Sequence, residues 1–99
     1  AGADTEKADG RGYTALMRTA REGHMKVAEA LLAAGADTEK ADEEGYTALM
    51  RAAEKGHIGV VEVLLAAGAD TEKLDSSSRT ALAHAQGKQA IVQLLQSPD

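Results

Sequence analysis

Residues 12–40 read GYTALMRTAREGHMKVAEALLAAGADTEK, and residues 45–73 read GYTALMRAAEKGHIGVVEVLLAAGADTEK. The two stretches are offset by 33 residues and are identical at 22 of 29 positions. A fixed period of roughly 20–50 residues is typical of stacked repeat proteins, in which each unit is too small to bury its own apolar face. The sequence therefore predicts a stack, and the function is to be sought on the surface of that stack.

Each copy contains the signals for two short helices. In the first copy, Thr14 is a good N-cap for a helix that Gly23 ends. A second helix follows, in which Val27, Leu31 and Leu32 recur with the spacing of one helical face. The short link between the helices predicts an antiparallel pair. The polar stretch that joins the two copies predicts an extended connector with a tight turn just before the next repeat.

Four sequence elements recur in order with this period: Gly-x-Thr-x-Leu, Ala-x-x-Gly-His, Val-x-x-Leu-Leu and Gly-Ala-Asp. Their order and spacing resemble the ankyrin repeat over nearly the whole chain. One departure is Thr-Ala-Leu-Met at residues 14–17 and 47–50, where the family usually has Thr-Pro-Leu-His. Alanine suits a first helical turn, and methionine can fill a gap between helices. The resemblance implies an all-α solenoid of about three helix-turn-helix units joined by hairpin-like loops.

We expect a single ankyrin-repeat domain over residues 1–99. Residues 1–7 match the tail of a preceding repeat, 8–40 and 41–73 are full repeats, and 74–99 are a shortened C-terminal capping repeat. The cap lacks the Gly-His pair, and glutamines lie among its apolar residues, as expected of a unit with one face in water. The N-terminal side has no such cap, which predicts a longer parent array or self-association through that face.

Composition argues against several kinds of partner. A net charge of -5 and a pI near 5.1 disfavour nucleic-acid binding, which relies on Lys and Arg to neutralise phosphates. No apolar run approaches the roughly 18 residues of a membrane span, so we expect a soluble protein that does not bind membranes. The absence of cysteine excludes disulfides and thiolate metal sites and is compatible with a cytoplasmic localisation.

The residues that could carry catalysis do not have a catalytic spacing. His24 and His57 lie one repeat apart, roughly 10 Å by ordinary helix packing, so one ion cannot bind both. In ankyrin repeats this histidine ties neighbouring loops by hydrogen bonds, and the resemblance implies the same role here. The serines at 76–78 fall in a turn, with no histidine base placed beside them. We predict no enzyme activity, no cofactor and no metal site.

A column of basic residues is one candidate for binding. By the resemblance, the position after Thr-x-Leu-Met faces the concave groove, and in the three units it holds Arg18, Arg51 and His84. Arginine makes bidentate contacts with carboxylates, so this column would suit an acidic segment of a partner protein. Alternatively, the arginines pair with nearby glutamates, namely Glu22, Glu29 or Glu54.

The sequence contains two tyrosines and no phenylalanine or tryptophan. Both tyrosines, Tyr13 and Tyr46, directly follow a turn glycine. Tyrosine is enriched in binding hot spots, although the two rings could instead stack on each other as filler between repeats. The resemblance places partner contacts at this position, at the turn residues before the glycine and at the pair before Gly-His. The candidate partner-binding residues are Arg11, Tyr13, Arg18, Arg21, Glu22, Glu43, Glu44, Tyr46, Arg51, Glu54, Lys55, Ser77, Arg79 and His84.

The sequence thus predicts a non-catalytic module that binds a partner protein through its concave groove and turn tips. Because the stack is preformed, little ordering entropy would be lost on binding. The alternative is an engineered or consensus-like ankyrin scaffold with no natural ligand, which the near identity of the two copies favours. A selected binding face would more often differ from repeat to repeat.

Overall fold

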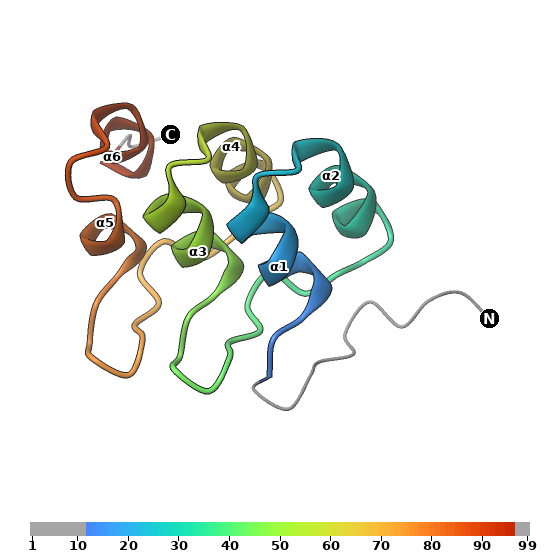
Figure 1. The fold of residues 1–99 in the computed structure, drawn as a ribbon, viewed down its shortest axis with the longest axis horizontal. Coiled ribbons are helices and arrows are strands. Elements are labelled where there is room, and N and C mark those ends of the chain that lie inside the picture. The colour runs from blue at the N-terminus through green and yellow to red at the C-terminus, as the bar shows by residue number, and fades with distance from the viewer. Residues whose placement is uncertain (1–11, 97–99) are drawn as a thin grey trace.

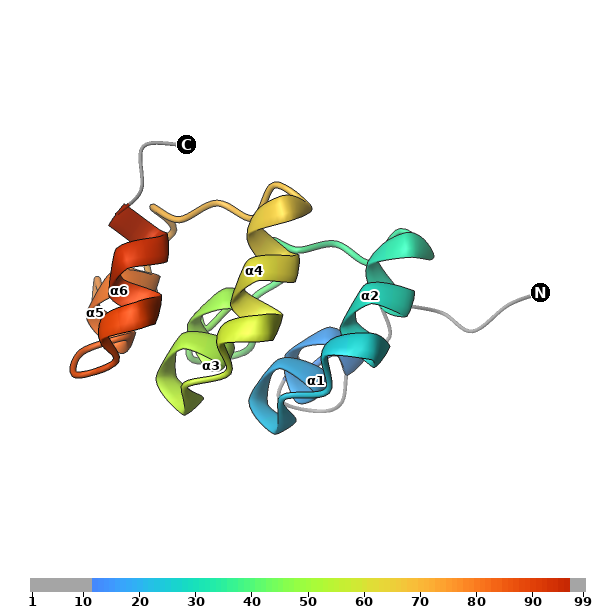
Figure 2. The same cartoon turned by 90° about the horizontal axis from the view of Figure 1, so that it is seen from above.

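A computed structural model describes residues 12–96, which fold into three pairs of helices (Figure 1). Within each pair the two helices run antiparallel, and the pairs stack side by side (Figures 1 and 2). The first helices of the pairs form an inner row from which the hairpin-like turns project, and the second helices form an outer row. The predicted all-α stack is confirmed. The helices are α1 (Ala15–Glu22), α2 (Met25–Ala33), α3 (Ala48–Lys55), α4 (Ile58–Ala66), α5 (Ala81–His84) and α6 (Gln89–Gln96).

The predicted ends of the inner helices are confirmed in detail. The hydroxyl oxygens of Thr14 and Thr47 each accept a hydrogen bond, at 3.3 Å, from the backbone N–H three residues later. Gly23 ends α1 in the left-handed conformation with φ of 81°. A Cβ at this position would lie 2.6 Å from Nδ1 of His57, so glycine also leaves room for the next repeat. A single residue therefore ends a helix and allows close stacking.

The core lies between the two rows of helices and between neighbouring pairs, since each helix packs both against the other helix of its pair and against its counterpart in the next pair. Its largest fully buried side chains are Leu16, Met17, Leu49, Met50, Val60, Val61 and Leu64. The two methionines stand at the position where the ankyrin family usually has histidine, and the expectation that they fill space between helices is confirmed. None of the helices between residues 12 and 96 is long and apolar enough to cross a bilayer.

The outer helix of the first pair is less buried than its sequence pattern predicted. Val27 is 49% exposed, whereas Val60, at the same position one repeat later, is 1% exposed. Val60 lies in α4, which packs against α2, α3 and α6. Within residues 12–96, α2 packs mainly against α1 and α4. The same residue is thus core or surface according to whether another repeat lies beside it.

We therefore expect the first pair of helices to open before the second. Amide hydrogen exchange should give α2 an opening free energy at least about 1 kcal/mol below that of α4, because α2 buries less apolar area. Ala28 and Ala30 replace the larger Val61 and Val63, which adds to the difference. Equal or better protection of α2 at matched pH and temperature would contradict this prediction.

The third pair departs from the other two at its turn and its first helix. Helix α5 has four residues, and the side chain of its N-cap, Thr80, makes no capping hydrogen bond. Ser78 occupies the position of the turn glycine Gly45 and has a φ of 62°, against 80° for the glycine. A serine in this region is strained, because its Cβ approaches the backbone.

Ser78→Gly should therefore stabilise the chain by about 1 kcal/mol, since it removes this strain. Urea denaturation should show a higher midpoint with an unchanged slope. Ser77→Gly is the matched control, because Ser77 is exposed in the same turn and has no positive φ. An equal or lower midpoint for Ser78→Gly would mean that the turn does not store this strain.

Candidate partner-binding face

The predicted binding residues within 12–96 come from α1, α3 and α5 and from the segments just before these helices. We call the surface that they form the inner face. Tyr13 is buried at 6% exposure, a correction to its expected place on the surface. Tyr46, Arg51, Glu54 and His84 are partly buried. Arg11 lies outside the described residues. The exposed members are Arg18, Arg21, Glu22, Glu43, Glu44, Lys55, Ser77 and Arg79.

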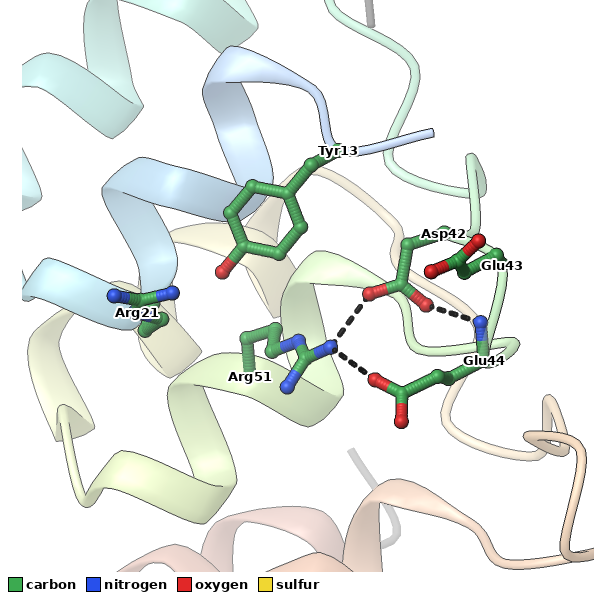
Figure 3. Close-up of a pocket in the computed structure, with 6 residues that line it drawn as sticks. All are labelled: Tyr13, Arg21, Asp42, Glu43, Glu44 and Arg51. Carbon is green, nitrogen blue, oxygen red and sulfur yellow. Dashed lines mark hydrogen bonds and ion pairs between the residues drawn. The ribbon is translucent and has the colours of Figure 1, made fainter. Parts of the chain in front are cut away.

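Asp42 organises the turn before α3 and attaches it to that helix. Its Oδ1 accepts hydrogen bonds from the backbone N–H groups of Glu44 (2.9 Å) and Tyr46 (3.0 Å). Its Oδ2 accepts one from Nη2 of Arg51 at 2.6 Å (Figure 3). Aspartate commonly stabilises turns by binding the backbone that follows it. One buried carboxylate thus fixes both the turn and the arginine on the inner helix.

Asp75 repeats this arrangement in the next unit. Its Oδ1 accepts from the backbone N–H groups of Ser77 (2.8 Å) and Arg79 (2.9 Å). Its Oδ2 lies 2.8 Å from Nε2 of His84, which must donate because a carboxylate can only accept. Burial raises the pKa of Asp75, but the hydrogen bonds from the Arg79 backbone, His84 and the Ser77 backbone lower it to about 2.

Arginines alternate with the two tyrosines along the inner face. The guanidinium carbon of Arg51 lies 3.9 Å from the ring centroid of Tyr46 and 5.5 Å from that of Tyr13. Arg21 lies 5.9 Å from the Tyr13 ring, and Nη2 of Arg79 donates to the Tyr46 hydroxyl at 3.0 Å. These distances suit cation–π contacts. The alternative that the tyrosine rings stack directly on each other is wrong, because Arg51 lies over both.

A shallow pocket of about 130 Å³ opens between the first and second repeats on this face. The side chains around it carry both signs of charge: the guanidinium of Arg21 lies at one side, and the carboxylates of Glu43 and Glu44 lie at the other (Figure 3). Between them lie Tyr13 and Arg51. A charged group bound in the pocket would therefore be attracted to one side and repelled from the other.

Comparison with known protein families agrees with this architecture. The family model described as "Ankyrin repeats (3 copies)" matches residues 1–75, which are 75 of the 99 residues. The chain belongs to the ankyrin-repeat family. No curated protein sequence matches it at a significant level. The helices α5 and α6 lie beyond the matched residues. Ankyrin repeats are generally protein–protein interaction modules and are typically non-catalytic.

The predicted basic column of this ankyrin protein is not a row of exposed cations. Arg51 is 14% exposed in its side chain and has carboxylates of Asp42, Glu44 and Glu54 at 2.6, 3.2 and 3.6 Å. Burial lowers its pKa, but the hydrogen bond and charge of Asp42 raise it above the ordinary value. Of the predicted glutamate partners, only Glu54 pairs with Arg51.

The third member of the column, His84, is 3% exposed in its side chain and bound to Asp75. Sequence reasoning missed Asp42 and Asp75, which are the main partners of the second and third members. A signal was present, because each aspartate stands nine residues before its partner. The first member, Arg18, is exposed.

The Gly-His histidine of the second ankyrin repeat has the role that the family resemblance implied. Nε2 of His57 lies 3.0 Å from the backbone oxygen of Arg21, so it links two neighbouring inter-helix loops. Its counterpart His24 is exposed and has Oε1 of Glu22 at 3.6 Å. No group of three or more metal-ligating side chains occurs in the range 12–96.

The pKa of Asp75 predicts an acid-sensitive third repeat. Because its folded pKa is lowered to about 2, its contribution to stability is fully present above about pH 4 and is lost as the pH falls from about 4 towards 2. The stability difference between the wild type and Asp75→Asn should therefore shrink across this window. A difference that stays constant between about pH 5 and pH 2.5, measured by urea denaturation, would contradict the prediction.

Proposed function

We propose that this ankyrin domain binds another protein through the inner face and performs no catalysis. The observation that carries the proposal is the arrangement around Asp42 and Asp75. Each carboxylate fixes a turn relative to an inner helix, and exposed charged side chains stand on the framework so formed. A face that is ordered before binding loses little conformational entropy on association.

The differences between the two repeats also support a binding role. On the inner helices, the pair before Gly-His is Arg21-Glu22 in the first repeat and Glu54-Lys55 in the second. The charges are in opposite order, so each repeat offers a different contact to a partner. The residues that hold the face together, such as Thr14 and Thr47, are unchanged.

Affinity capture with two triple variants would test the proposal. Arg18→Ala, Arg21→Ala and Lys55→Ala alter the inner face, whereas Lys26→Ala, Glu29→Ala and Glu62→Ala alter exposed positions on the outer helices. A partner should be retained by the wild type and by the outer variant and lost by the inner one. Circular dichroism and the denaturation midpoint show that each variant is folded.

The opposite outcomes are equally informative. A partner that the inner variant retains, or that both variants lose equally, would exclude the inner face as the binding site. If neither the wild type nor the outer variant retains any protein, the result would favour a scaffold with no natural ligand. The near identity of the two repeats is the observation that keeps this second candidate in view.

A further inference from the structure

Two arginines of α1 differ from the other arginines of the inner face. Arg18 and Arg21 lie one helical turn apart and are both exposed. Neither guanidinium forms a hydrogen bond or an ion pair with the residues at 12–96, whereas Arg51 and Arg79 each have an aspartate within 3.1 Å. Like charges one turn apart repel each other, so this pair is unfavourable in the absence of an anion.

The contrast between Arg18 and Arg51 has a local cause. One turn after Arg51, α3 has Glu54, whose Oε1 lies 3.6 Å from Nη1 of Arg51. At the equivalent place α1 has Arg21, so an internal anion is replaced by a second cation. Among residues 12–96, the arginine at this position thus has carboxylate partners in the second repeat, whereas in the first it has a second arginine one turn away.

The backbone and side chain of Arg21 are held from two directions. Its carbonyl oxygen binds Nε2 of His57 in the next repeat at 3.0 Å, and its guanidinium lies over the buried Tyr13 ring at 5.9 Å. Such contacts restrict the range over which the guanidinium moves. A restrained arginine loses less conformational freedom when it binds a carboxylate.

We propose that α1 binds a short carboxylate-rich segment of the partner protein, with one carboxylate held between Arg18 and Arg21. This inference rests on the function proposed above and names the chemistry of the partner at one end of the inner face. Arginine guanidinium groups recognise carboxylates through paired hydrogen bonds. The acidic segment lies along α1 and away from the next turn, because Glu43 and Glu44 at the far side of the pocket repel it (Figure 3).

A peptide titration of the full chain tests this site directly. The probe is a capped heptapeptide with three central glutamates flanked by glycine and serine, and matched peptides carry glutamine, lysine or phosphoserine instead. Two-dimensional NMR at low salt follows the Arg Nε–Hε signals and the amides of α1. We expect the glutamate peptide to bind in the millimolar range and to shift the signals of Arg18 and Arg21, while the glutamine and lysine peptides do not.

Charge-swap variants provide the controls. Arg21→Glu with Glu22→Lys keeps the net charge and gives α1 the Glu-Lys pair that α3 already carries. This variant should bind the glutamate peptide at least about threefold more weakly, as expected when an exposed charge pair is replaced by repulsion. Lys26→Glu with Glu29→Lys makes the same exchange on the exposed side of α2 and should bind like the wild type.

Several results would overturn the inference. They are equal shifts with the glutamine peptide, unchanged affinity in the α1 swap, or binding of the phosphoserine peptide alone, which would point to phosphate as the ligand. Failure here remains distinct from failure of the proposed function. A partner that is captured through the inner face while the glutamate peptide does not bind would preserve the function and remove only the acidic segment.

Discussion

Asp42→Ala should lower the free energy of unfolding by about 3 kcal/mol. The substitution removes a carboxylate that accepts three hydrogen bonds, and it leaves the partly buried guanidinium of Arg51 without its closest partner. The lost contacts are the two backbone hydrogen bonds in the turn and the 2.6 Å ion pair to Arg51. The ordered turn before α3 should be lost first.

Chemical denaturation with two further variants separates these contributions. Asp42→Asn keeps an oxygen for the turn but places an amide group opposite Arg51, so its stability should fall between those of the wild type and the alanine variant. Asp70→Ala is the control, because the carboxylate of the exposed Asp70 accepts a hydrogen bond from the N–H of Glu72 and from no other group at residues 12–96. This variant should lose less than about 1 kcal/mol of stability. Similar losses for Asp42→Ala and Asp70→Ala would show that the buried network contributes little.

The parts of the fold that were predictable from sequence are those set by neighbouring residues. Thr14 and Gly23 mark the ends of α1 because a hydroxyl cap and a left-handed glycine act within one helical turn. The repeat period then fixes the stack, because each pair must cover the next. Both inferences depend on spacing along the chain, which a sequence displays directly.

The environment of each position was less predictable, because it depends on contacts between repeats. Tyr13 and Tyr46 occupy the same place in identical local sequences, yet one is buried and the other is partly exposed. Arg18 and Arg51 likewise share their motif but differ in partners, since among residues 12–96 only Arg51 forms ion pairs, with Asp42 and Glu54. A repeated sequence therefore does not ensure a repeated environment, and the candidate site lies where the environments differ.

Gly45→Ala should destabilise the chain by about 3 kcal/mol, because it combines backbone strain with a clash between neighbouring turns. Gly45 has a φ of 80°, a region that an alanine adopts only at a cost. An added Cβ would also lie 2.7 Å from the backbone nitrogen of Ser76 and 3.0 Å from Cα of Asp75. These are backbone atoms of the next turn, so they cannot move aside without separating the second and third repeats.

Gly68→Ala isolates the strain from the clash. Gly68 has a φ of 88°, but a Cβ there would meet no atom within 4 Å, so this variant should lose only about 1 kcal/mol. The excess loss in Gly45→Ala measures the packing of one turn against the next, where the Ser76 N–H donates to the Glu44 oxygen at 3.0 Å. Hydrogen exchange should accordingly speed up in α5 and α6 while α1 and α2 stay unchanged. Equal losses in the two variants would mean that the turns do not couple the repeats, and the inner face would then be three separate surfaces.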